Sequence, residues 1–361
     1  MKKKIRIKDI ANKAEVSTGT VDRVLHNRGK VSPEVKERVL KVIDEIGYER
    51  NILASALAYN RTVRIASLLP SPEDDLYWSQ TNDGVLKAVK AVQHYGLALE
   101  QTFFNYGSPA SFVEKAKAVI KTLPDGLLFP PMFAEEARWL IKECEEHEIP
   151  YVIINTNLEG AEPLCYIGQD SYQSGVLGAR LLNFGLNDGG VVCILNLDYS
   201  TKAAQHLISK EQGFRDYFEE INNKQVQIIR EDFDQFDDPK KLGVFLNNLI
   251  NNTPLLRGIF VTNSRAHKIL ECIEDLIVSK NLKIVGFDLI DPNLNYLRTN
   301  KINFLINQNP ADQGFRGIYS LFKSLIRNEE VEKQQYLPLD IVVKENEAYH
   351  VKKLTEVELV L

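Results

Sequence analysis

The 361-residue chain has no long apolar segment and few cysteines. No run approaches the roughly 18 consecutive apolar residues that a membrane-spanning helix requires. The basic start MKKKIRIK is followed by IANKAEV and not by the apolar stretch of a secretory signal, so we expect a cytoplasmic protein that enters no membrane. The cysteines are Cys144, Cys165, Cys193 and Cys272. Because they are widely spaced and form no C-x-x-C pair, we expect reduced, mostly buried thiols and no metal site.

The chain also lacks the short motifs that identify common enzymes. It has no P-loop, no G-x-G-x-x-G, no G-x-S-x-G and no H-E-x-x-H. Its histidines, which show no metal-ligand spacing, are His26, His94, His147, His206, His267 and His350. We therefore expect neither catalysis nor a cofactor.

Positive charge is scarce in most of the chain and concentrated at its start. Residues 1–64 hold 15 Lys or Arg against 8 Asp or Glu, a balance of +7, whereas the remainder holds 29 against 41, a balance of −12. The excess favours a polyanion as the partner of the N-terminal part. A solvated basic tail is the alternative, but a tail would not carry periodic apolar residues and helix-start signals.

The first fifty residues predict three short helices. Apolar residues recur at helical spacing from Ile7 to Ala14, and a second helix within Val16 to Leu25 follows a very short turn and can be capped by Ser17. A third helix begins at Ser32-Pro33-Glu34 and ends at Gly47. Such a helix-turn-helix can place its second helix in the major groove of DNA.

The N-terminal segment resembles the headpiece and hinge of the lactose-repressor/galactose-repressor (LacI/GalR) family. The similarity is dense over IKDIANKAEVSTGTVDRVLHNRGKVSPEVKERVLKVIDEIGYERNILASALA, from Ile7 to Ala58, and the order of strands and helices beyond it fits the family. The resemblance implies a homodimer whose two headpieces read a palindromic operator in double-stranded DNA. The expected domains are a headpiece over residues 1–48, a hinge helix and linker over 49–62 and a ligand-binding core over 63–361.

The resemblance places the DNA contacts of the headpiece on and just after the second helix. Thr18, Gly19 and Asp22 match positions that touch base edges, and Arg23 beside them could bind guanine O6 and N7. The expected DNA-binding residues here are Thr18, Gly19, Thr20, Asp22, Arg23 and Asn27. Asp22 could instead orient Arg23 or a nearby Lys through a salt bridge, and both interpretations stay open.

Two residues of the headpiece depart from the family pattern. Glu15 fills a turn position that usually holds Gly, so either it adopts a left-handed conformation at a cost of about 1 kcal/mol or the turn is remodelled. Gly19 removes a side chain that would otherwise read a base, so the operator should differ from those of better-known members. Arg50 also replaces the Pro usual just before the hinge.

The stretch NILASALA, Asn51 to Ala58, resembles the hinge helix of the family. Asn51 can cap it, and Ala54 and Leu57 lie on one side, but so short a helix should form only when paired with its copy on DNA. In the family the residue matching Leu57 is a wedge in the minor groove. We therefore expect DNA contacts from Asn51, Ala54 and Leu57, and the alternative is that Leu57 packs onto the core.

From Arg64 onward, strand and helix signals alternate. Apolar runs such as RIASLLP, GLLFPP, PYVIIN, GVVCILNL, GIFVTN and KIVGFD are separated by segments of helical period. This alternation predicts an α/β core of parallel sheets covered by helices, and about ten strands exceed one sheet. The resemblance implies two doubly wound lobes, as in type I periplasmic sugar-binding proteins. The N-lobe would span about 63–170 plus 307–335, and the C-lobe about 171–306 plus 336–361.

Polar residues that end the apolar strands are the expected lining of a cleft between these lobes, because ligands bind beyond the carboxyl ends of parallel strands. The candidates, which match cleft positions of the family, are Asp170, Asn263, Asp288 and Gln308. Sugar hydroxyls need such paired donors and acceptors in a dry cleft.

Aromatic and basic residues complete the expected effector site. The segment Ser71 to Gln80 is predicted to be a loop in which Tyr77 and Trp78 either stack on a sugar ring or pack beneath the loop itself. Lys210 replaces an Arg usual in the family, and a single-point cation at that position suggests a sugar, sugar phosphate or sugar acid as the effector. Four other side chains, Arg265, Arg298, Phe233 and Phe236, are expected at the surface or in the core in preference to the cleft.

The expected function is repression of a carbohydrate-use operon under the control of this effector, which would close the lobes and change the pairing of the hinge helices. The sequence does not give the sign of the response, so a ligand-dependent activator or a corepressor-type regulator is the alternative. A more distant alternative is a sugar-binding carrier, which the segment Asn307 to Gly317 resembles. Such a carrier needs an export signal and has no helix-turn-helix.

Overall fold

The computed structural model describes residues 7–25, 31–46, 62–186, 189–198 and 205–355. The chain divides into two compact units, residues 1–61 and 62–361, which we describe separately. The first unit includes the predicted headpiece, and we call the second unit the core. No helix within the described ranges is long and apolar enough to cross a membrane.

The described part of the headpiece consists of α1 (Ile7–Lys13), α2 (Thr18–Leu25) and α3 (Pro33–Ile46), which confirms the three helices predicted from the sequence. Small aliphatic side chains, among them Ile10, Val21 and Val39, are fully buried between the helices. Ser17 caps α2, since its Oγ accepts a hydrogen bond from the backbone N–H of Thr20 (3.0 Å).

The turn between α1 and α2 keeps its tight geometry although it lacks glycine. Glu15 has φ 53°, in the left-handed region, and Val16 N–H donates to Ala11 O (3.0 Å). Of the two possibilities raised by the sequence, Glu15 therefore adopts the strained conformation and the turn is not remodelled.

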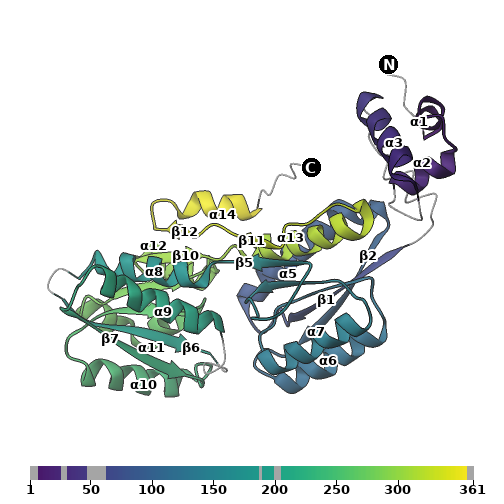
Figure 1. Ribbon diagram of the computed structural model, residues 1–361. Coiled ribbons are helices and arrows are strands. Elements are labelled where there is room, and N and C mark those ends of the chain that lie inside the picture. The colour runs from purple at the N-terminus through teal and green to yellow at the C-terminus, as the bar shows by residue number, and fades with distance from the viewer. Residues whose placement is uncertain (1–6, 26–30, 47–61, 187–188, 199–204, 356–361) are drawn as a thin grey trace. The chain divides into compact units, whose positions relative to one another are not determined.

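The core contains two six-stranded sheets within the described residues, one in each lobe (Figure 1). The N-lobe strands are β1 (Val63–Pro70), β2 (Leu97–Phe104), β3 (Gly126–Phe129), β4 (Tyr151–Asn155), β5 (Cys165–Gly168) and β11 (Gln334–Tyr336). They are all parallel, in the order β11-β5-β4-β3-β1-β2.

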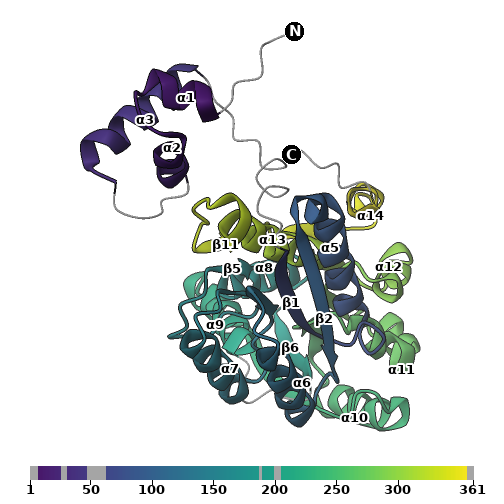
Figure 2. The same ribbon diagram turned by 90° about the vertical axis from the view of Figure 1, so that its right-hand side faces the viewer.

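Helices cover both faces of the N-lobe sheet. They are α5 (Leu76–Val92), η1 (Gln93–Tyr95), α6 (Pro109–Lys121), α7 (Ala134–Glu146), α13 (Pro310–Phe322) and η2 (Lys323–Arg327). Two separate apolar clusters show the layering, because α5 and α13 pack on one face and α6 and α7 on the other (Figure 2). This arrangement makes the N-lobe a three-layer α/β/α structure.

The C-lobe repeats this design with one antiparallel edge strand. Its strands are β6 (Gly190–Leu197), β7 (Val226–Phe233), β8 (Leu256–Val261), β9 (Lys283–Phe287), β10 (Phe304–Asn307) and β12 (Asp340–Val342). Their order is β12-β10-β9-β8-β6-β7, and only β12 among these strands runs antiparallel to its neighbour. The fold class predicted from alternating strand and helix signals is thereby confirmed.

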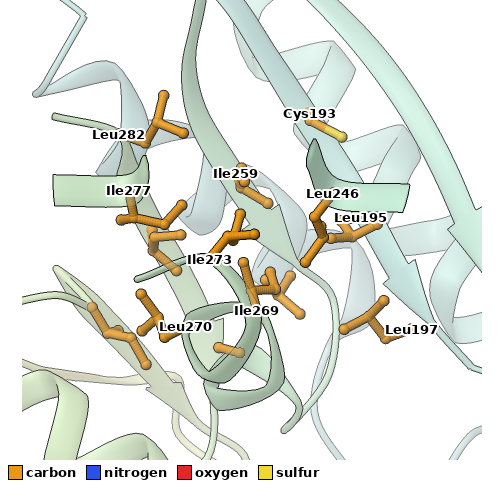
Figure 3. Packing of buried hydrophobic residues seen from close by; sticks show 14 of the residues in the cluster. Cys193, Leu195, Leu197, Leu246, Ile259, Ile269, Leu270, Ile273, Ile277 and Leu282 are labelled. Carbon is orange, nitrogen blue, oxygen red and sulfur yellow. The ribbon is translucent and has the colours of Figure 1, made fainter. Parts of the chain in front are cut away.

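Helices also cover both faces of the C-lobe sheet. They are α8 (Ser171–Asn183), α9 (Gln205–Glu220), α10 (Pro239–Asn252), α11 (Ala266–Ser279), α12 (Asp291–Arg298) and α14 (Glu347–Thr355). One apolar cluster joins α8 and α9 to the sheet, and another joins α10, α11 and α12 to its opposite face. Figure 3 shows part of the second cluster, in which Leu195 of β6, Ile259 of β8 and Ile269 of α11 are fully buried.

The chain crosses between the lobes in three places: after β5, after β10 and after β11. One side chain ties the three crossing segments together. Gln169, in the first crossing, donates from Nε2 to Asn307 O (2.7 Å) in the second and to Pro338 O (3.0 Å) in the third. We call these three crossings the hinge between the lobes.

One local prediction is wrong. The segment Ser71 to Gln80 is not a loop throughout, because α5 begins at Leu76 and carries Tyr77 and Trp78 in its first turn. Asp75 caps this helix, with its side chain accepting from Tyr77 N–H (2.9 Å). The cluster of Ser, Pro, Glu and Asp before Leu76 is therefore the approach to a capped helix, and its last acidic residue is the cap.

Glu15→Gly should stabilise the headpiece by about 1 kcal/mol, because glycine adopts the left-handed conformation without a Cβ clash. Amide exchange of Val21 and Val39 in the full-length protein should slow by about fivefold. The matched control, Glu37→Gly at an exposed site inside α3, should accelerate exchange, since glycine destabilises a helix interior by about 1 kcal/mol. Faster exchange in Glu15→Gly would show that Glu15 is not strained.

Candidate functional site

A cavity between the two lobes collects most of the residues expected to bind an effector. We call it the inner chamber. The predicted residues that line it are Tyr77, Trp78, Lys210, Asn263 and Gln308. Other polar residues along its wall, which the sequence did not single out as effector ligands, include Asp75, Tyr106, Asn155, Thr156, Asp198 and His206. The chamber thus has aromatic rings beside several hydrogen-bonding groups, as a sugar site requires.

Tyr77 and Trp78 are both part of the N-lobe core and part of the chamber wall. Their side chains are 5% and 4% exposed, and the two rings meet edge to face with centroids 5.0 Å apart. The Tyr77 hydroxyl accepts a hydrogen bond from Asn155 Nδ2 (2.7 Å). Burial raises the pKa of Tyr77 well above its ordinary value, so the phenol stays neutral and can offer a hydrogen bond at the wall.

A chain of polar groups links Lys210, Gln308 and Asp288. The Lys210 ammonium donates to Thr262 O (2.8 Å) and to Gln308 Oε1 (3.3 Å), and it lies 3.8 Å from the centre of the Phe287 ring. Gln308 in turn donates from Nε2 to Asp288 Oδ2 (2.7 Å). Asp288 is fully buried behind Gln308 and does not line the chamber, so it positions Gln308 and balances the charge of Lys210.

Burial shifts the pKa values of the two charged residues in this series, Asp288 and Lys210. Loss of hydration raises the pKa of Asp288 to about 7, although hydrogen bonds from Gln308 and the charge of Lys210 oppose the shift. Loss of hydration also lowers the pKa of Lys210 to about 8, and the charge of Asp288 opposes this change. The charged form of Asp288 is therefore favoured first by the hydrogen bonds from Gln308 and then by Lys210, whereas that of Lys210 is favoured by Asp288.

Asn263 follows β8 and also holds together the ends of two strands. Its Nδ2 donates to Leu197 O (2.9 Å), at the end of β6, and its Oδ1 accepts from Arg265 N–H (3.2 Å). Asn263 thereby fixes the segment that carries Arg265 into the cleft.

Asp170 does not join the others in the inner chamber. It caps α8, accepting at Oδ1 from Gln173 N–H (2.9 Å), and it lines a different cavity together with Tyr172 and Tyr336. The geometry gives the effector role expected of Asp170 no support, because a carboxylate at a helix start already has a structural role as the cap.

Arg265 lies in the cleft, which was the less favoured of the positions that the sequence left open for it. Its side chain is only 7% exposed. Nη2 lies 2.7 Å from Asp75 Oδ2 of the N-lobe, and Nη1 lies 3.4 Å from Asp198 Oδ2 of the C-lobe. The guanidinium also contacts the rings of Tyr106 and Phe236, with centroids 4.7 and 4.6 Å away. We call these five residues the interlobe clasp.

The remaining residues that the sequence considered for the cleft have other surroundings. Phe236 belongs to the clasp and is at once a core residue and part of the cleft lining. Phe233 stacks on Phe245 (4.5 Å between centroids). Arg298 pairs with Glu347 (2.9 Å) and lines neither cavity at the cleft.

A second cavity lies on the other side of Arg265. We call it the outer vestibule. It shares Asp75, Tyr106, Ser264 and Arg265 with the inner chamber and is otherwise lined by residues such as Asn105, Asp237, His267 and Lys268. The clasp is therefore the partition between two parts of one cleft.

Two further hydrogen bonds join the lobes at equivalent strand ends. Asn155 ends β4 and Asp288 follows β9, and both have left-handed backbone with φ 68°. The residue after each of them bonds to the opposite lobe. The two bonds join Thr156 Oγ1 to His206 Nδ1 (3.1 Å) and Gln80 Nε2 to Leu289 O (3.1 Å). Strained strand ends of this kind are concentrated at functional sites.

The headpiece presents the expected DNA-reading residues on α2. Thr18, Gly19 and Arg23 are exposed, whereas Thr20 and Asp22 are partly buried. Arg23 Nε donates to Gly19 O (3.2 Å), and this hydrogen bond holds the Nε end of the guanidinium against the preceding turn of the same helix. The other expected DNA-binding residues, Asn27, Asn51, Ala54 and Leu57, lie outside the described residues, as does Arg50.

Two family models match the chain. Residues 6–51 match the bacterial regulatory proteins of the lacI family, and residues 65–329 match the periplasmic binding protein domain. Among curated relatives, the HTH-type transcriptional regulator MalR of Streptococcus pneumoniae is 26% identical over 312 residues, which cover 83% of this chain and 88% of MalR. The ribose operon repressor of Halalkalibacterium halodurans is 25% identical over 290 residues, covering 78% of this chain and 80% of the repressor.

Solved structures share the fold of the core. A chain from Bacteroides fragilis described as a LacI transcriptional regulator has a TM-score of 0.73 at 28% identity, covering 80% of this chain and 99% of that one. A solute binding protein from Agrobacterium vitis, solved with bound alpha-D-tagatopyranose, has a TM-score of 0.69 at 22% identity, covering 79% of this chain and 96% of that one. The second likeness concerns the fold alone.

His206→Gln should reduce the loss of stability on acidification. Burial, helped by the charge of Lys210, lowers the pKa of His206 to about 4, against about 6.5 for a free imidazole. Between these values the unfolded chain binds a proton that the folded chain does not, so stability present above pH 6.5 is lost as the pH falls. Urea unfolding at pH 7 and pH 5 should show that the wild type loses about 1–2 kcal/mol more than the variant.

The control for this comparison is His94→Gln, because His94 is exposed at the end of α5. It should keep the pH response of the wild type. If His206→Gln lost as much stability as the wild type between the two pH values, a buried neutral His206 would be ruled out.

Proposed function

The chain belongs to the lacI family of bacterial regulatory proteins, and from that membership we propose that it represses a carbohydrate-use operon. It is a DNA-binding transcriptional regulator with a sugar-binding-like core. The observation that carries the proposal is the inner chamber, where rings and paired donors and acceptors from both lobes surround one cavity. A ligand in that cavity would contact both lobes at once and so favour one arrangement of them.

In the proposed assembly, two copies of the chain bind a palindromic operator in double-stranded DNA. Residues 1–48 form the headpiece that reads each half-site, residues 49–62 form the hinge helix and linker, and residues 63–361 form the effector-binding core. Thr18, Arg23 and the neighbouring residues of α2 would face the major groove, since this helix presents them to solvent. We place this action in the cytoplasm, where the DNA is.

The proposed effector is a sugar, sugar phosphate or sugar acid bound in the inner chamber. Tyr77 and Trp78 would contact the apolar side of its ring, and Asn263, Lys210 and Gln308 would bind its hydroxyls. Asp288 would act through Gln308, whose side chain it holds. The name of the ribose operon repressor and the tagatopyranose bound to a structural neighbour support a sugar as the effector class.

Control would follow from linkage between the core and DNA. An effector that binds one arrangement of the lobes more tightly shifts the population toward it, and that arrangement favours or disfavours the paired hinge helices. A coupling free energy of about 1–3 kcal/mol suffices for a change of roughly 5- to 150-fold in DNA affinity. The proposal assigns no catalytic role, because the curated relatives are transcriptional regulators.

Arg23→Ala should weaken binding to the operator by about 1–3 kcal/mol and change binding to random duplex little, if Arg23 binds a base edge. The operator is obtained by selecting duplexes from a random pool with the full-length protein, and binding is measured by fluorescence anisotropy at fixed salt. Arg38→Ala, at an exposed site on α3, is the control and should retain wild-type affinity for both duplexes. An equal loss on both would show that Arg23 contacts only phosphate.

Lys210→Met should abolish most effector binding while the protein stays folded, because methionine fills the volume of the buried lysine but cannot donate a hydrogen bond. A thermal-shift screen of sugars, sugar phosphates and sugar acids identifies the effector, since ligand binding raises apparent stability. Calorimetry should then show at least about tenfold weaker binding by the variant, equivalent to 1.4 kcal/mol.

Lys268→Met is the control for the loss of a partly buried lysine, because Lys268 lines the outer vestibule and pairs with Asp237 (2.5 Å). It should bind the effector within about threefold of the wild type, a difference below 1 kcal/mol. Undiminished binding by Lys210→Met would remove Lys210 from the effector site. If no compound of the screen stabilised the wild type, the proposed effector class would be rejected.

A further inference from the structure

The position of Arg265 divides the interlobe cleft into a small part and a large part. The inner chamber offers about 70 Å³ to the centres of water molecules, and the outer vestibule offers about 430 Å³. By this measure the space on the inner side of Arg265 is about one sixth of the space on its outer side, so the inner chamber is the more restrictive of the two for a ligand.

The partition between the two cavities is held in place strongly. Arg265 forms an ion pair with one carboxylate of each lobe, Asp75 of the N-lobe and Asp198 of the C-lobe. The side chains of these two residues are only 10% and 16% exposed. Leu197 O accepts a further hydrogen bond from Nη1 (3.2 Å). Moving the guanidinium aside would leave two mostly buried carboxylates facing each other without a cation, which is strongly unfavourable. A ligand therefore cannot enlarge the chamber cheaply by displacing this side chain.

The side chains around the Arg265 guanidinium also have the character of a binding site for a second sugar ring. Tyr106 and Phe236 both lie within 4.7 Å of Arg265 Cζ, measured to their ring centres. Aromatic faces that pack on a planar guanidinium can equally pack on the apolar side of a sugar ring. Asp75 and Asp198 could then accept hydrogen bonds from hydroxyls. Arg265 thus occupies the space that the second ring of a disaccharide would need.

We propose that Arg265 determines the length of the effector: the clasp closes the inner chamber behind a single sugar ring and excludes disaccharides. The inference rests on the proposed function, in which the inner chamber holds a sugar effector. It goes further by naming the size class of that effector and the residue that sets it. The second ring of a disaccharide would clash with the Arg265 side chain, and a clash built against the wrong ligand is a common source of specificity.

The test compares matched pairs of sugars on the full-length protein: glucose with maltose, galactose with lactose, and xylose with xylobiose. Thermal shift finds the pair that binds, and calorimetry gives both dissociation constants. The wild type should bind the monosaccharide at least about tenfold more tightly than its disaccharide, and Arg265→Ala should lower this preference by at least about tenfold. Wild-type binding of a disaccharide as tight as that of its monosaccharide overturns the proposal.

Two further variants keep the test decisive. Because Arg265→Ala leaves two carboxylates without their partner, the double variant Asp198→Asn/Arg265→Ala removes one of them and should fold with the same relaxed preference. Arg230→Ala is the matched control, since Arg230 is also partly buried and pairs with two carboxylates, Glu211 (2.7 Å) and Asp232 (3.0 Å), but within the C-lobe alone. It should keep the wild-type preference.

The outcomes separate this inference from the proposed function. An unchanged preference in both Arg265 variants, or an equal change in Arg230→Ala, overturns the role of Arg265 while the sugar effector stands. If no compound in the wider screen of sugars, sugar phosphates and sugar acids stabilises the wild type, the proposed effector class fails and the inference fails with it.

Discussion

The cleft depends on one electrostatic constraint, which is that the buried guanidinium of Arg265 must be matched by negative charge. An unpaired cation in the interior would cost far more than the fold can supply, and the match comes from one carboxylate of each lobe, Asp75 and Asp198. The pairing therefore holds the two lobes together at the cleft in this arrangement. The other interlobe contacts, such as that between Thr156 and His206, belong to the same arrangement.

The hinge and the clasp constrain the same motion in different ways. At the hinge, Gln169 bonds to the backbone of both other crossing segments, so the three segments move as one connection. The clasp joins side chains across the cleft, and its ion pair, unlike the hinge, can be broken without altering the backbone. The proposed control by an effector requires two arrangements of the lobes, and a continuous hinge combined with a breakable clasp is compatible with that requirement.

The sequence patterns predicted two kinds of feature. One is secondary structure, which follows from local periodicity, and the other is the position of residues at strand ends, because parallel strands end at one edge of a sheet. Alternating strand and helix signals predicted an α/β core of parallel sheets, the family resemblance implied its two lobes, and polar strand ends indicated Asn263 and Gln308, which line the chamber. The cleft was only the less favoured position for Arg265, because its partner Asp75 is 190 residues away and an isolated charge in a sequence is usually exposed. Asp170 was misleading for a local reason, since a strand-end carboxylate can cap the next helix as readily as face a ligand.

The recognition helix raises the question of why α2 keeps a glycine in its first turn. Gly19 weakens the helix by about 1 kcal/mol relative to alanine. A Cβ at this position would meet no crowding, because its nearest contact, Ser17 Oγ, would lie 3.8 Å away, so packing does not demand glycine. What glycine leaves open is the exposed helix surface beside Arg23, whose Nε is held by the Gly19 carbonyl. In the proposed function, a base edge would approach the backbone there while the neighbouring guanidinium is already oriented, and this approach would offset the stability that Gly19 costs.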